Sequence, residues 1–117
     1  MNLPIENFGE TTQVSMTILV DNRTDRLVES TATVKRFVEE PLLAEYGFAA
    51  LVDLKPNGAR ILWDAGISHV ALPENLRRMK IAPASIQPIA LSHGHDDHTT
   101  AVADILRAMN LKMTART

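Results

Sequence analysis

The sequence predicts an α/β protein of one domain, with helices covering one face of a small sheet. Its 117 residues fit a single domain. Hydrophobic residues make up 45% of the chain and charged residues 22%, a composition typical of a soluble globular protein rather than a disordered one. In the second half, short apolar runs alternate with segments of helical spacing, and this order predicts helices packed on a sheet.

Three strands are expected in the first half of the chain. Residues 14–21 alternate in polarity and are rich in β-branched side chains, which is typical of a strand. Residues 48–54 form a short apolar run, as buried strands do. Residues 60–64 are expected to return alongside that strand, because Asn57 and Gly58 form a dipeptide that favours a tight hairpin turn.

The remaining elements are helices, a loop and a fourth strand. Residues 23–40 fit either a short helix or a loop. Residues 41–47 begin with proline and end with glycine, which suits one or two helical turns. Residues 69–81 and 100–110 have apolar side chains at helical spacing, and residues 88–92, between them, are apolar enough for a buried strand.

Composition also limits the classes of partner and cofactor. The formal net charge of −2 argues against nucleic acid, and the basic group Arg77, Arg78 and Lys80 is expected to be the solvated face of a helix. The chain has no cysteine, so any metal must be held by nitrogen and oxygen ligands. The N-terminus lacks a secretory signal and no apolar run has membrane-spanning length. We therefore expect a cytoplasmic protein without a membrane partner.

Three of the four histidines lie in the segment LSHGHDDHTT, residues 91–100. In an extended chain His93 and His95 project to the same side, so both rings can reach one ion at about 2.0–2.1 Å. Asp97 and His98 stand where the next helix begins and point to a second position nearby. Two metals about 3.5–4 Å apart would generate a hydroxide nucleophile at neutral pH. The alternative is a polar surface loop that happens to be rich in histidine.

The pattern His93-x-His95-x-Asp97-His98 resembles the metal-binding signature of the metallo-β-lactamase superfamily of metal-dependent hydrolases. The resemblance extends over most of the chain, from about residue 14 to residue 111. His69 matches no ligand position and is expected to be structural. Further segments resemble the superfamily, in part its pterin-related synthase subgroup: VDN, LLAEYGFAALVD, ILWDAGIS and IAPASIQPIALSHGHDDHT.

The resemblance implies a role for each residue of the candidate site. His93 and His95 would bind a first metal, and Asp97 and His98 a second. Asp97 would also be catalytic, orienting the attacking water. Asp64 would lie buried behind the ligands and hold the metal loop in place; alternatively, it only caps the end of its strand. Zinc is the expected metal, with iron or manganese as alternatives.

The resemblance further implies that residues 1–117 form the N-terminal half of an αβ/βα sandwich, a mixed sheet with helices on one face, incomplete at its C-terminus. The expected function is hydrolysis of an ester, phosphoester or related small molecule by a metal-activated hydroxide. The chain alone offers at most two ligands for each metal and is expected to be inactive. Its partner would be the missing C-terminal half or a second copy. The alternative is a non-catalytic metal-binding half-domain that acts through self-association.

Overall fold

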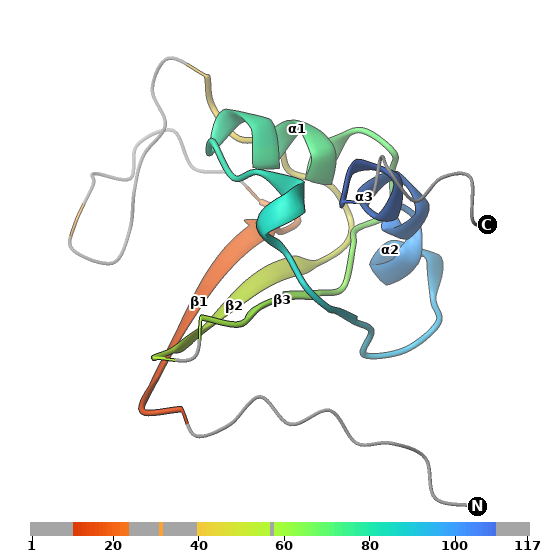
Figure 1. Cartoon of the computed structure of the whole chain (residues 1–117). Helices are drawn as coiled ribbons and strands as arrows, with labels where there is room; N and C mark the ends of the chain where they lie inside the picture. The colour runs from red at the N-terminus through yellow and green to blue at the C-terminus, as the bar shows by residue number, and fades with distance from the viewer. Residues whose placement is uncertain (1–10, 24–30, 32–39, 57, 110–117) are drawn as a thin grey trace, which may run out of the picture.

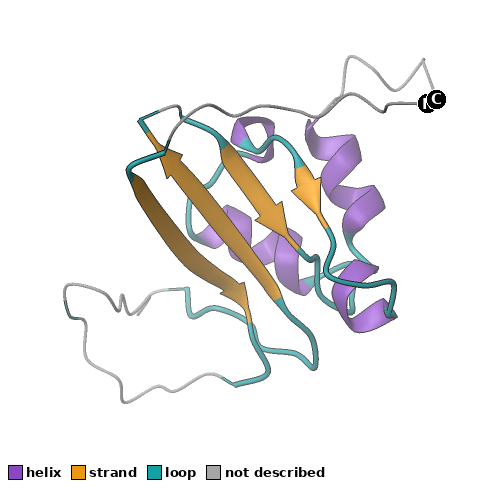
Figure 2. Cartoon of the chain, turned by 90° about the horizontal axis from the view of Figure 1, so that it is seen from below, coloured by secondary structure: helices purple, strands orange, loops and turns teal. Residues whose placement is uncertain are grey.

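The protein is described here by a computed structural model that covers residues 11–23, 31, 40–56 and 58–109. It confirms an α/β fold, in which a four-stranded mixed sheet carries its helices on one face (Figures 1 and 2). Most of residues 23–40 lie outside the described part of the chain, so the choice between helix and loop stays open there. The strands are β1 (Gln13–Val20), β2 (Ala49–Lys55), β3 (Arg60–Trp63) and β4 (Ile89–Ala90).

The strands lie in the order β1-β2-β3-β4. β1 and β3 both pair with β2 antiparallel, whereas β4 is parallel to β3. The parallel connection passes through α1 (Ala71–Arg78) and a short 3₁₀ turn, Pro83–Ser85. After β4 the chain forms α2 (Asp96–Thr99), a single turn, and then α3 (Val102–Met109). The expected helices over residues 69–81 and 100–110 are confirmed with shorter bounds.

The hairpin between β2 and β3 is also confirmed. Gly58 has a positive φ of 78°, a conformation that glycine adopts without steric cost. Its N–H donates to the carbonyl of Leu54 at 2.9 Å, and the N–H of Leu54 donates to the carbonyl of Ala59 at 2.8 Å. These bonds close the turn and set the register of β3 against β2.

The fourth strand is shorter than its apolar sequence suggests. The N–H of Asp64 donates to the carbonyl of Ala90 at 2.9 Å, and that is the last backbone bond of the β3–β4 ladder. Beyond it, the N–H of Ser92 donates to a side chain, the carboxylate of Asp64, at 2.7 Å. The chain therefore leaves the sheet two residues after β4 and enters the histidine-rich segment, residues 92–100.

The prediction of helical turns over residues 41–47 is wrong, because that segment has no helix. Its backbone groups bond to distant parts of the chain instead. The side chain of Asn75, on α1, accepts from the N–H of Leu43 at 2.8 Å and donates to the carbonyl of Leu43 at 2.9 Å. The N–H of Glu45 donates to the carbonyl of Asp21 at 3.1 Å. These tertiary bonds replace the local bonds of a helix.

The hydrophobic core lies between the sheet and the helices. Leu51 and Leu62 project from β2 and β3, and Leu72, Leu76 and Ile105 project from α1 and α3. Each of these five side chains is almost completely buried. The alternation of side chains along a strand directs the intervening residues to the opposite face of the sheet, away from the helices.

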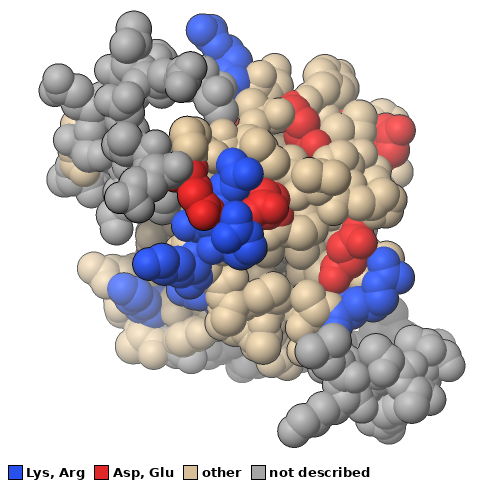
Figure 3. All heavy atoms as spheres, turned by 90° about the horizontal axis from the view of Figure 1, so that it is seen from above, with Lys and Arg blue, Asp and Glu red and all other residues tan. Residues whose placement is uncertain are grey.

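Two residues of the predicted basic group, Arg77 and Arg78, lie at the end of α1 and pair with neighbouring acids. Arg77 pairs with Glu74 at 2.5 Å and with Glu40 at 2.9 Å, and Arg78 pairs with Glu74 at 3.4 Å. Figure 3 shows basic and acidic side chains interspersed on this side of the molecule. In the described part of the chain, every helix is too short or too polar to cross a membrane.

Replacing Asn75 by Ala is expected to destabilise the fold by about 2–3 kcal/mol, because it removes the partner of buried backbone groups. Arg77→Ala, on the exposed face of the same helix, should leave the free energy of unfolding nearly unchanged, because surface ion pairs stabilise little. Urea unfolding monitored by circular dichroism measures both. Equal losses in the two variants would contradict the role assigned to Asn75.

Candidate metal centre

The histidine turn, residues 92–100, connects β4 to α3. The backbone of His95 is extended, with φ −69° and ψ 147°, and α2 begins at the next residue. The first part of the turn is therefore open chain, and the second part is one helical turn. Asp97 and His98 lie within α2, and α2 lies next to the end of β3. On the right-hand side of Figure 1, α2 is drawn below α3.

Three of the four predicted metal ligands come together in the structure. Donor atoms of His93, Asp97 and His98 all lie within 4.8 Å of one another. The rings of His93 and His98 are 4.2 Å apart between centroids. His95 is not part of this group, although its ring meets that of His93 edge-on at 4.6 Å. The division into two pairs for two metals stays a prediction, whereas the geometry favours three ligands for one ion.

Asp64 contacts this cluster from its buried side. It follows β3 directly, is only 1% exposed, and has a positive φ of 61°, which is uncommon for a residue with a side chain. Its carboxylate accepts hydrogen bonds from the N–H of Ser92, the hydroxyl of Ser92 and Nδ1 of His98, each at 2.7 Å. One buried side chain thus joins the end of β3 to Ser92, next to the first ligand, and to His98, the last ligand.

Opposing effects act on the pKa of Asp64. Burial is the largest single effect and raises the pKa, because it disfavours the charged carboxylate. The hydrogen bonds from Ser92 and His98 together outweigh burial, so the pKa lies below its ordinary value. Asp64 is therefore an ionised carboxylate near neutral pH and can only accept hydrogen bonds.

This charge determines which nitrogen of each ring carries hydrogen. Nδ1 of His98 must be the donor to Asp64, so its Nε2, 3.3 Å from a carboxylate oxygen of Asp97, keeps a lone pair in the neutral ring. The hydroxyl of Ser92 has one hydrogen and gives it to Asp64. Nδ1 of His93, 2.8 Å from that hydroxyl, must then donate to it. In the neutral form of each ring, Nε2 therefore carries the lone pair that can bind a cation.

Ser92 was missed in the sequence. It stands directly before His93 as the last residue of the predicted strand, and nothing in the local sequence marks it as part of the site. Its function depends on contact with Asp64, which is 28 residues away in the sequence. Only the pairing of β3 with β4 brings the two residues together.

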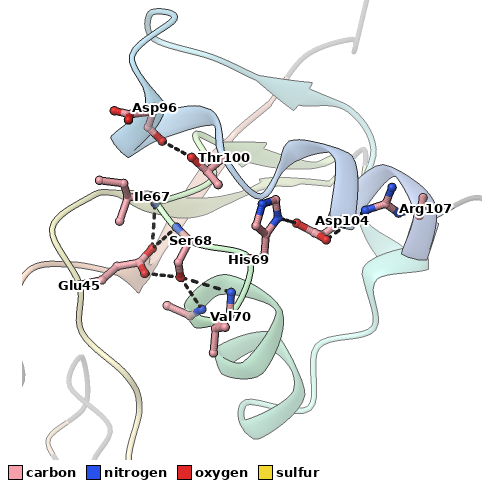
Figure 4. A network of polar contacts seen from close by, with 10 residues as sticks. Glu45, Ile67, Ser68, His69, Val70, Asp96, Thr100, Asp104 and Arg107 are labelled. Atoms are coloured by element: carbon pink, nitrogen blue, oxygen red, sulfur yellow. Dashed lines mark hydrogen bonds and ion pairs between the residues drawn. The ribbon is translucent and has the colours of Figure 1, made fainter.

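The fourth histidine lies in a different network. Nδ1 of His69 is 2.6 Å from a carboxylate oxygen of Asp104, which also pairs with Arg107 at 3.2 Å (Figure 4). The hydrogen bond with His69 is the main reason why the pKa of Asp104 lies below its ordinary value. His69 joins the loop before α1 to α3 and is not in the three-residue group.

The donor set suits a divalent cation of intermediate hardness. Two imidazole nitrogens and a carboxylate fit zinc, iron or manganese, and the chain has no thiolate to compete. Catalytic zinc sites have three protein ligands and an open position. His93 is exposed while Asp97 and His98 are half-buried, so the cluster is supported on one side and open to solvent on the other.

Two curated relatives from Methanocaldococcus jannaschii match this chain. An uncharacterized protein is 43% identical over 72 residues, which are 62% of this chain and 25% of that protein. A 7,8-dihydropterin-6-methyl-4-(β-D-ribofuranosyl)-aminobenzene-5′-phosphate synthase is 33% identical over 72 residues, 60% of this chain and 24% of that enzyme. The chain spans about a quarter of the length of the curated relatives that it matches. No family model matches it.

These comparisons overturn the assignment to the metallo-β-lactamase superfamily. The matching relatives are named as a pterin-compound synthase and an uncharacterized protein, and no family model supports the superfamily. The physical reason for the error is that the resemblance rested on a six-residue motif and a few short segments beside it. Such a motif specifies a local arrangement of ligands and does not by itself define a family.

Asp64→Asn is expected to reverse the tautomer of His98. The amide oxygen must accept from the N–H of Ser92, so the amide NH₂ faces Nδ1 of His98, which then has to accept. Nitrogen-15 NMR of the neutral imidazoles should show the Nδ1–H form in the wild type and the Nε2–H form in the variant. Asp104→Asn, the matched control, should leave His98 unchanged. An Nε2–H tautomer of His98 in the wild type would contradict the assigned network.

Proposed function

We propose that His93, Asp97 and His98 bind one divalent metal ion, zinc in the first instance, and that the site serves hydrolysis of a small-molecule ester or phosphoester. The observation that carries the proposal is the gathering of three donor groups within 4.8 Å. The hydrogen bonds of the two Nδ1 atoms add to it, because they leave Nε2 of each neutral ring unprotonated. Iron and manganese are the alternative metals.

A bound divalent ion lowers the pKa of water and so supplies a nucleophile near neutral pH. The chain's own residues supply position and charge. Asp64 and Ser92 fix both imidazole rings, and such supporting contacts raise the basicity of the ligand nitrogens. Asp97 brings a negative charge to the cluster. There it serves as a ligand and can also accept a proton from an attacking water.

The class of substrate is proposed from the exposed position of the site and from one relative. The product in the name of the related synthase carries a 5′-phosphate, which favours a phosphorylated small molecule. His93 is exposed, so a ligand can approach the cluster from its side. A phosphoester is therefore the preferred substrate of this proposal, ahead of a carboxylic ester.

A second candidate function, binding without catalysis through self-association, is favoured by the uncovered face of the sheet. Val14 and Met16 of β1 are 63% and 59% exposed, and Trp63 of β3 is 40% exposed. The strand register places eight apolar residues on this side of the sheet, of which Ala50 is buried: Val14, Met16, Ile18, Ala50, Val52, Leu54, Ile61 and Trp63. Contiguous apolar surface of this kind marks interaction sites. A second copy fits it, because two uncharged faces meet without repulsion.

Metal binding is the first expected outcome. The wild-type chain should bind zinc or cobalt(II) with a stoichiometry near one, and His93→Ala/His98→Ala should weaken binding by at least about 100-fold. His69→Ala is the matched control, since it removes a histidine outside the group. Calorimetric titration measures all three proteins. Equal affinity in the double variant and the wild type would exclude the site.

Hydrolysis is expected to be slow and metal-dependent. Two ligands for each of two metals would leave the chain inactive, but three ligands on one ion meet the requirement for catalytic zinc. The metal-loaded chain should cleave bis(p-nitrophenyl) phosphate, and Asp97→Ala or removal of the metal should abolish cleavage while His69→Ala retains it. If the metal-loaded wild type shows no turnover, the non-catalytic candidate replaces the hydrolase.

Self-association is expected at micromolar concentration. Met16→Glu places a charge on the open face, midway along the edge strand β1, and should shift the protein from dimer to monomer, because an unpaired charge resists burial. Leu106→Glu, at an exposed leucine on α3, should leave the dimer intact. Analytical ultracentrifugation distinguishes the states. A wild-type protein that stays monomeric throughout would rule out this second candidate.

A further inference from the structure

Glu45 makes an unusual set of contacts for a half-buried carboxylate. One oxygen, Oε1, accepts from the N–H groups of Ile67 and Ser68 at 2.8 and 3.2 Å, and Oε2 accepts from the hydroxyl of Ser68 at 2.5 Å (Figure 4). The same hydroxyl accepts from the N–H groups of Val70 and Ala71, each at 3.2 Å. A single side chain thus fixes the turn between β3 and α1.

The segments on either side of these contacts are bonded to the histidine turn. The N–H of Phe48 donates to the carbonyl of Asp97 at 3.2 Å, and the N–H of Ala65 donates to the carbonyl of His98 at 2.7 Å. The N–H of Gly66 donates to the carbonyl of Phe48 at 3.0 Å. Three stretches of chain, residues 45–48, 65–68 and 97–100, therefore form a closed ring of hydrogen bonds that includes both backbone carbonyls of the ligand pair.

Gly47 shows how closely these stretches approach. A Cβ atom there would lie 2.6 Å from the carbonyl oxygen of Asp97 and 3.1 Å from the N atom of Ile67. Both neighbours are backbone atoms that cannot rotate away, so only glycine fits. The segment that follows Glu45 is thus pressed directly against the metal-binding residues.

We infer that Glu45 is a positioning residue for the proposed metal centre, an inference that rests on the proposed function. It does not reach the cluster. It closes the ring of residues 45–48, 65–68 and 97–100, and so fixes the backbone from which Asp97 and His98 project. Asp64 orients the ring of His98 from one side, and Glu45 holds the carbonyls of Asp97 and His98 in place from the other. Outer contacts of this kind change metal affinity by about 10–100-fold.

The test compares three variants of the full chain. Glu45→Ala removes every acceptor, whereas Glu45→Gln keeps a carbonyl oxygen for the two N–H groups and an amide near Ser68. Glu40→Ala is the matched control, because Glu40 pairs only with the exposed Arg77 among the described residues. Hydrogen exchange of the amides of Phe48 and Thr100, measured without metal, shows whether the closed ring of hydrogen bonds is intact. The cobalt(II) absorption spectrum measures metal affinity and ligand geometry.

Glu45→Ala should speed exchange at Phe48 and Thr100, weaken cobalt binding about 10-fold and alter the spectrum. Glu45→Gln should restore affinity to within about threefold of the wild type, and Glu40→Ala should change none of the readouts. If Glu45→Ala binds cobalt as tightly as the wild type and with the same spectrum, the inference is overturned and the metal site stands. If the wild type binds no cobalt, the proposed function falls and the inference falls with it.

Discussion

The buried carboxylate of Asp64 is the interaction on which the candidate metal centre depends. It lies directly after β3 with a left-handed backbone, a conformation that costs a residue with a side chain roughly 1–3 kcal/mol. Hydrogen bonds from Ser92 and His98 hold it there. The same bonds join the end of β3 to the histidine turn, so the local backbone strain and the placement of the ligands have one cause.

Two carboxylates constrain the turn in different ways. Asp64 sets the direction and tautomer of the ring of His98, and through Ser92 it also sets those of the ring of His93. Glu45 acts on the backbone, because the turn that it fixes is bonded to the carbonyl of His98. Ligand atoms on a short loop would otherwise move with that loop. Fixing both side chains and backbone before an ion arrives lowers the entropy lost on binding.

Local patterns predicted most of the fold, because periodicity directly reflects which faces of a strand or helix are buried. They failed at residues 41–47, where glycine and proline suggested helical turns. Asn75, far away in the sequence, satisfies the backbone of Leu43 instead. The same limit applies to the site. Three ligands are close in sequence and could be grouped, whereas Ser92 acquires its function only through the pairing of β3 with β4. The family could not be inferred from one short motif and a few short segments.

X-ray absorption at the zinc edge of the metal-loaded protein tests the central claim most directly, because it reports the ligand atoms themselves. Two imidazole rings and a carboxylate predict a shell of nitrogen and oxygen near 2.0–2.1 Å, with multiple scattering from two imidazoles. Asp64→Asn should reduce the imidazole signal, since it turns Nε2 of His98 into a donor. A wild-type spectrum with one imidazole or none, or a spectrum that Asp64→Asn leaves unchanged, would contradict the account.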